Sequence, residues 1–330
     1  MMKKALKAVG SAWGQRVTIL VLICVIMAAT QPVFFRAANA RSILLAIAVN
    51  GIIACGMLFT VLVGGLDLSV GSMAGFSACI AFSVADSFDF TDSSFILGCI
   101  LALLLCFAAG YINGYFVTRI GVPAFVITMA MKYALYGAIF FITHGFYLYI
   151  PRRVTLISEL GNESILGVPI PIVLFVLVVV ICAFVLGKTP FGRKLYIIGG
   201  NKNVAVLSGI NSNMNIRAAY IISSVLAGIG GILLASMNGQ AGQLTALGYE
   251  GNVLMAMVVG GINLTGGEGG VPGAIFGALF VGIINNIMLL LSISSDYQTF
   301  IQGVIIVAAM TLNIYTRRGS AGEFKIIKTS

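Results

Sequence analysis

The sequence predicts an all-α protein, a polytopic transmembrane helical bundle of about ten spans with a pseudo-repeat and short broken or re-entrant segments. Of its 330 residues, 59% are hydrophobic and 9% are charged, whereas an ordinary soluble domain carries about 25% charged side chains. The mean hydropathy of +1.07 indicates that lipid surrounds most of the exterior, where helices satisfy the backbone internally. Forty glycines are typical of membrane helices that approach one another closely.

The spans follow one another in order, each long enough to cross about 30 Å of hydrocarbon or bounded by charged and turn residues. They are predicted at 17–35, 42–63, 69–85, 95–117, 122–143, 170–187, 216–237, 252–261, 271–291 and 299–315. The third and eighth are short or glycine-rich, so either is a candidate for the broken segment. The first 40 residues also resemble a cleavable signal peptide, but we expect the first span to be retained. One transmembrane domain, residues 1–330, is predicted, with its longest loop at 188–215.

The positive charge indicates orientation. Nineteen Lys and Arg against ten Asp and Glu leave a net charge of +9, and fourteen of the nineteen fall on one side of the predicted topology. Because cytoplasmic loops hold the excess of basic residues, both termini are expected in the cytoplasm. The charge therefore does not predict a nucleic-acid partner.

An internal repeat links two distant segments. Residues 63–69 read VGGLDLS and residues 259–265 read VGGINLT, at a constant offset of 196. A true repeat predicts two related halves with unwound backbone at corresponding places, as transporters use; the alternative is chance recurrence of glycine. Six predicted crossings separate the copies, which makes the repeat parallel unless one segment is re-entrant.

The sequence is poor in groups for catalysis. His144 is the one histidine, and the six cysteines lie singly in apolar runs, so no metal site or disulfide framework is indicated. We expect no catalytic residue and no cofactor on this chain, and hence no enzyme. A membrane enzyme that gathers residues from different spans is the alternative.

Polar groups at membrane depth are the candidates for a translocation pathway. Lys132 lies within the fifth span, where a charge costs roughly 2.5–3.5 kcal/mol, so it is expected to face a cavity or to pair with a carboxylate, Asp67 being nearest in depth. The alternative is a misplaced span boundary. The candidate pathway residues are Asn50, Asp67, Ser69, Asn113, Lys132, Asn285, Asn286 and Tyr297. Amides suit a neutral polyol or hydrogen bonds between helices, and tyrosine suits a sugar face or the membrane interface.

The loop at 188–215 carries a predicted short helix of about seven residues. Asn201 is a suitable N-cap and Gly209 a suitable stop, with Val204 and Leu207 on one face. Such a helix is expected to dock a partner; the alternative is an interfacial helix lying on lipid. The candidate contact residues are Gly199, Gly200, Asn201, Val204, Leu207, Ser208, Gly209 and Asn211.

Three ordered motifs resemble a known family. Residues 65–72, GLDLSVGS, resemble the signature of the ribose/galactose-type permeases of bacterial ABC sugar importers. The segments TPFGR (189–193), GGN (199–201) and SGIN (208–211) are similar to the part of that family that contacts its ATPase. GYE (248–250) and LTGGEG (264–269) match its later signature.

The resemblance implies a multi-pass permease of the bacterial inner membrane that imports a monosaccharide or small polyol. It implies a second permease subunit, identical or different, and two ATP-binding subunits or one fused double ATPase that hold ATP and Mg. A periplasmic binding protein would deliver the sugar, and the segment 202–208 would act as a lever. Asn252 stands where the family has an acidic residue and Tyr136 where it has arginine, which leaves the sugar open. The alternative is an ion-driven secondary transporter or channel acting alone, for which Asp67 is the candidate carboxylate.

Overall fold

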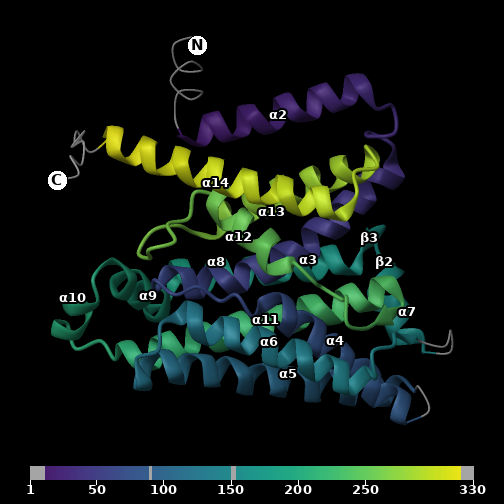
Figure 1. Ribbon diagram of the computed structural model, residues 1–330, viewed down its shortest axis with the longest axis horizontal. Helices are drawn as coiled ribbons and strands as arrows, with labels where there is room; N and C mark the ends of the chain where they lie inside the picture. The colour runs from purple at the N-terminus through teal and green to yellow at the C-terminus, as the bar shows by residue number, and fades with distance from the viewer. Residues whose placement is uncertain (1–11, 89–90, 150–153, 321–330) are drawn as a thin grey trace.

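The computed structural model describes residues 12–88, 91–149 and 154–320, with side chains described up to Thr311. The remaining segments lie outside the described part, and they include some of the basic residues used to predict orientation: Lys3, Lys4, Lys7, Arg152, Arg153, Lys325 and Lys328. Thirteen α-helices and one π-helix account for most of the described chain, so the all-α prediction is confirmed. The long helices run side by side along the long axis (Figure 1).

The long helices are α2 (Ala12–Thr30), α3 (Ala37–Leu62), α4 (Val70–Ser87), α5 (Asp92–Tyr115), α6 (Ala124–Thr143), α8 (Ile170–Lys188), α11 (Ser212–Asn238), α13 (Val271–Leu290) and α14 (Ser295–Ser320). The short ones are α7 (Thr155–Asn162), α9 (Pro190–Gly200), α10 (Lys202–Leu207) and α12 (Tyr249–Val259), and a π-helix, η1 (Phe116–Ile120), extends α5. Helices α9 and α10 lie at one end of the bundle and α7 at the other (Figure 1); we call these the α9–α10 end and the α7 end.

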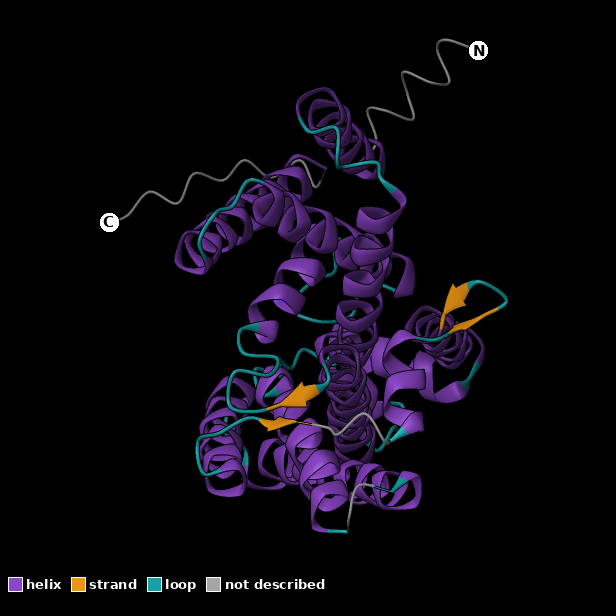
Figure 2. Cartoon of the chain, turned by 90° about the vertical axis from the view of Figure 1, so that its right-hand side faces the viewer, coloured by secondary structure: helices purple, strands orange, loops and turns teal. Residues whose placement is uncertain are grey.

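Four two-residue strands form two small antiparallel pairs, drawn as arrows in Figure 2. Strand β1 (Leu148–Tyr149) pairs with β4 (Gln240–Ala241), and β2 (Ser164–Ile165) pairs with β3 (Val168–Pro169). The first pair joins the segment after α6 to the segment after α11. It therefore ties the connection between α6 and α7 to the connection between α11 and α12.

Eight of the described helices are long and apolar enough to cross a membrane: α2 to α6, α8, α11 and α13. The third predicted span is α4, a continuous helix of 18 residues. The eighth is α12, whose 11 residues rise only about 16 Å at 1.5 Å per residue. The broken segment is therefore the eighth, and the tenth predicted span corresponds to α14.

The segment before α12 completes that crossing without helical structure. After β4, the carbonyl groups of Thr245 and Ala246 lie against Gly75 and Gly71 of α4, where a side chain would clash. Non-helical backbone at membrane depth is tolerated where it is buried against protein, and this stretch meets that condition. Helix α12 then leads to the loop at 260–270, at the α9–α10 end.

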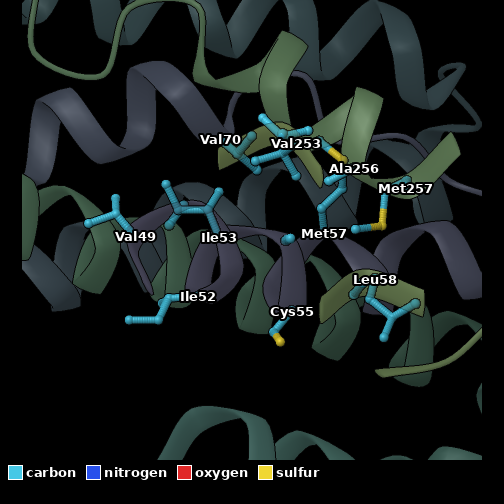
Figure 3. Packing of buried hydrophobic residues seen from close by; sticks show 14 of the residues in the cluster. Val49, Ile52, Ile53, Cys55, Met57, Leu58, Val70, Val253, Ala256 and Met257 are labelled. Carbon is cyan, nitrogen blue, oxygen red and sulfur yellow. The ribbon is translucent and has the colours of Figure 1, made fainter. Parts of the chain in front are cut away.

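Helix α3 forms the centre of the core, with 78% of its apolar window buried. Figure 3 shows Ile53 and Met57 of α3 close to Val253 and Ala256 of α12, and all four are buried. Helix α2 lies at the edge, with 11% of its window buried. The short helix α12 therefore packs against α3, whose window is the most buried of the eight candidate spans.

Candidate functional site

The connection between α8 and α11 presents a short capped helix. The Oδ1 atom of Asn201 accepts hydrogen bonds from the backbone N–H groups of Asn203 (2.9 Å) and Val204 (3.2 Å). Gly209 ends the turn at φ +71°, which glycine adopts without strain. The predicted helix is confirmed, with six residues. Its apolar side chains Val204 and Leu207 are 49% and 88% exposed, whereas Ala205 is buried.

Two of the predicted contact residues cap helices in this connection. Ser208 is its C-cap. Asn211 is instead the N-cap of α11, because its Oδ1 accepts from the N–H of Met214 at 3.1 Å. The predicted set is therefore divided among three helices, since Gly199 and Gly200 end α9, the residues from Asn201 to Ser208 form or cap α10, and Asn211 caps α11.

Helix α9 connects this surface to the interior of the bundle. Gly199 packs against the carbonyl of Leu62 and the amide of Gly267 so closely that a Cβ atom has no room. The N–H of Gly267 donates to the Leu62 carbonyl at 2.9 Å, and the Tyr196 hydroxyl donates to the Gly269 carbonyl at 3.0 Å. The end of α9 thus contacts both the end of α3 and the loop at 260–270.

The two copies of the repeat have matching backbone turns. Helix α3 ends where Gly65 N–H donates to the Thr60 carbonyl (2.9 Å), and α12 ends where Ile262 N–H donates to the Met257 carbonyl (3.0 Å). Both are the six-to-one bond of a Schellman turn. The two copies lie against each other, since a Cβ atom at Gly64 would lie 3.0 Å from the Thr265 carbonyl. The helix ends are offset by 197 residues rather than 196, so the second copy is one residue shorter at the turn.

The turn that follows is also shared. Asp67 Oδ1 accepts from both the N–H and the hydroxyl of Ser69. Asn263 Oδ1 accepts from the N–H (3.2 Å) and hydroxyl (2.9 Å) of Thr265. The two copies therefore share one hydrogen-bonding pattern although the residues differ. The acceptor is the carboxylate of Asp67 in one copy and the amide oxygen of Asn263 in the other.

Asp67 is the centre of a fully buried polar cluster. Its second oxygen accepts from the Ser223 hydroxyl at 2.8 Å, and Asn113 Nδ2 donates to the Ser69 hydroxyl at 3.2 Å. The cluster joins the connection after α3 to α11 and α5. Burial raises the pKa of Asp67 above 3.8, and the hydrogen bonds from Ser69 and Ser223 oppose that rise.

Lys132 has a carboxylate partner, but the predicted one is wrong. Its Nζ lies 2.7 Å from Oε1 of Glu250, in the first turn of α12, and the two side chains are 24% and 14% exposed. Thr128, one turn earlier on α6, is the residue that reaches the Asp67 connection, donating to the Leu66 carbonyl at 3.0 Å. Asp67 is also already occupied by its serine donors, so Lys132 pairs with Glu250 instead.

Two of the predicted amides, Asn285 and Asn286, connect helices. Asn286 and Asn39 form a reciprocal pair at 2.8 and 3.1 Å between α13 and α3. Asn285 donates to Asn252 and accepts from Gln302, both at 3.3 Å. These contacts match the alternative of hydrogen bonds between helices.

The predicted pathway residues therefore do not form a single site. The structure brings together Asp67, Ser69 and Asn113, and it places Lys132 with Glu250. Asn50 donates to the Ala46 carbonyl of its own helix, and Tyr297 is 68% exposed near the start of α14. Sequence reasoning missed Glu250 as a partner, although its position at the start of a short helix after glycine was a usable signal. Within the part of the chain that the structure describes, no group of three or more His, Cys, Asp and Glu could hold a metal ion.

Comparisons with known proteins cover almost the whole chain. The profile of the family described as "Branched-chain amino acid transport system / permease component" matches residues 39–310. The ribose import permease protein RbsC of Haemophilus influenzae is 33% identical over 304 residues, 90% of this chain and 91% of the relative. The L-arabinose transport system permease protein AraH of Escherichia coli is 32% identical over 315 residues, 94% of this chain and 93% of the relative. A solved inward-facing structure of a metal-chelate type ABC transporter aligns with a TM-score of 0.49 and 15% identity, covering 92% of this chain and 98% of the other.

Proposed function

Because the chain belongs to the branched-chain amino acid transport system / permease component family, we propose that it is the membrane-spanning permease subunit of a bacterial ABC importer for a monosaccharide or related small polyol. The observation that supports this proposal most directly is the sequence identity of 32–33% with ribose and L-arabinose permeases along nearly the full length of both chains. Pentoses are accordingly the first substrates to test.

The proposed complex contains further subunits. ATP and Mg belong to two ATP-binding subunits or one fused double ATPase, and a periplasmic protein delivers the sugar. A second permease subunit completes the pathway, with a homodimer as the simpler arrangement. We place the α9–α10 end and both termini in the cytoplasm, in keeping with the excess of basic residues on that side.

In this proposal, α10 receives the movement of the ATPase. Its exposed Val204 and Leu207 supply apolar contact, and the packing of Gly199 on Leu62 and Gly267 supports transmission to the ends of α3 and α12. ATP binding would then shift the bundle between outward-open and inward-open populations. The chain itself carries out no chemical step.

Reconstitution tests the proposal. The chain, its ATPase and its binding protein are placed in proteoliposomes, and uptake of radiolabelled ribose and L-arabinose is measured with ATP or a non-hydrolysable analogue at the ATPase. We expect uptake only with hydrolysable ATP and binding protein. Uptake by the chain alone under an ion gradient would instead establish the secondary-transporter alternative.

A further inference from the structure

A cavity of about 500 Å³ opens on the outer surface of the bundle between α5 and α11. Its walls include Phe107 and Tyr111 from α5, and Met214, Ala218 and Ile221 from α11. Phe107, Tyr111 and Met214 are 50%, 44% and 71% exposed, so the cavity faces outward from the helices. Its volume lies within the range of about 300–1,000 Å³ found for small-molecule sites.

The close packing of α5 on α11 fixes the shape of this cavity. Gly110 and Gly114 bring the backbone of α5 against Ile221 and Arg217 of α11, where a Cβ atom would lie 2.8 and 2.7 Å from their Cα atoms. Aromatic side chains on one helix and aliphatic ones on the other then border a groove at the α9–α10 end. These are the surfaces on which a hydrocarbon chain packs.

Arg217 supplies the charge of the cavity, whose polar lining also includes Asn211 and Asn213 at the start of α11. Its guanidinium lies over the rings of Tyr115 and Tyr111, at 5.1 and 5.9 Å from the ring centroids. Its Nε donates to the Thr118 hydroxyl at 2.8 Å. Within the described residues, the hydrogen bonds of Arg217 use only Nε, so the two Nη groups are available to a ligand.

The charge of Arg217 has no carboxylate partner among the described residues, where the ion pair found is that of Lys132 with Glu250. Helix α11 is long and apolar enough to cross a membrane, and Arg217 is its sixth residue, about 7.5 Å along the helix axis from the first. A partly buried charge without a partner is unfavourable there. An anion bound by the free Nη groups would remove that cost, with the planar donor geometry that phosphate favours.

We propose that this cavity is a binding site for an anionic phospholipid, with its phosphate on Arg217 and an acyl chain along Phe107, Ala218 and Ile221. The apolar walls distinguish this ligand from free phosphate, which would use Arg217 alone. They also argue against a second copy of this chain, because an isologous contact would bring two uncompensated Arg217 side chains together. The site depends on the membrane setting and not on the transported substrate.

Native mass spectrometry of the full complex tests the proposal. The detergent-solubilised complex is titrated with phosphatidylglycerol, phosphatidylcholine or inorganic phosphate, and retained ligand is counted. We expect phosphatidylglycerol to be retained in preference to phosphatidylcholine, and Arg217→Gln to weaken its retention about fivefold, since a basic residue near an anionic surface has an effect of this order. Arg119→Gln, the matched control in the exposed π-helix of the same end, should leave retention unchanged.

Two further variants separate the charge from the apolar walls. Ala218→Phe fills the cavity and leaves Arg217 in place, so it should reduce retention of phosphatidylglycerol. Arg217→Lys keeps the charge and should retain most of the preference, which also gives a folded comparison if Arg217→Gln lowers the yield. Equal retention of both lipids, equal loss in Arg119→Gln and Arg217→Gln, or displacement of the lipid by inorganic phosphate would each overturn the proposal. These readouts detect lipid directly, so a failed transport assay leaves them unaffected.

Discussion

The ion pair between Lys132 and Glu250 yields a prediction that a double-mutant cycle can test. The perturbation is Glu250→Gln, which leaves the Lys132 ammonium without its partner 2.7 Å away. Lys132→Met removes the other charge, and the double variant removes both. If the pair is the reason that Lys132 is tolerated within α6, each single variant leaves one charge without a partner. The loss of stability in the double variant should then be smaller than the sum of the losses in the two single variants.

The exposure of the two side chains sets limits on the loss of unfolding free energy expected for Glu250→Gln. Removing one member of a buried pair costs about 3–5 kcal/mol, whereas exposed pairs contribute about 0–1 kcal/mol. The side chains here are 24% and 14% exposed, which places the pair between these limits. We therefore expect Glu250→Gln to lower the free energy of unfolding by about 2 kcal/mol, and the coupling energy of the cycle to be about 1–2 kcal/mol.

The assay is unfolding of the detergent-solubilised chain by denaturant for the wild type and the three variants, with membrane abundance measured in parallel. ATP-driven uptake of the same variants tests the pathway role, and Lys132→Met is expected to impair it while abundance is retained. Strict additivity of the single variants would refute the pairing argument. Unchanged uptake in Lys132→Met would remove Lys132 from the mechanism.

Three further predictions concern the turns and the α9–α10 end. Gly199→Ala should destabilise the protein by about 2 kcal/mol or more, because the new Cβ meets two backbone groups, whereas its matched control Gly200→Ala faces open space and should be neutral in the same thermal unfolding assay. The raised pKa of Asp67 means that the native state binds more protons than the unfolded state, so stability should fall as pH rises from 3.8 through the raised pKa; Asp67→Asn should flatten that decline in unfolding measured at a series of pH values. Leu207→Glu should uncouple ATP hydrolysis from uptake more than Val206→Glu does. If the Leu207→Glu variant retained ligand-stimulated ATPase activity together with full uptake, the proposed role of α10 as a lever would be contradicted.

The fold was largely predictable because hydrophobic length is a strong signal in a membrane chain. Eight of the predicted spans are helices of adequate length in the structure, and glycine-rich turns correctly marked the ends of α3 and α12. Sequence alone left open whether the third or the eighth span was broken. The answer depends on the packing of Thr245 and Ala246 against Gly75 and Gly71, a contact between segments about 170 residues apart that no local pattern encodes.

The polar partners were less predictable for the same reason. Depth along the span pointed Lys132 to Asp67, but Ser223, far along the chain, occupies that carboxylate. The helix α10 was predictable because Asn201 and Gly209 act within a few residues of one another. Local capping chemistry was therefore recoverable, whereas pairing between helices required the tertiary structure.

The contacts of α9 explain how one surface helix can act on both halves of the repeat. Gly199 meets Leu62 at the end of α3 and Gly267 in the loop after α12, so the two repeat turns cannot separate from α9 independently. The buried Asp67 cluster follows the first turn. Gly71 lies against Glu250, the partner of Lys132, in the helix that precedes the second turn. A displacement of α9 would therefore act directly on both repeat turns through the backbone contacts of Gly199, and we expect the Asp67 cluster and the Lys132–Glu250 pair beside those turns to respond together in transport.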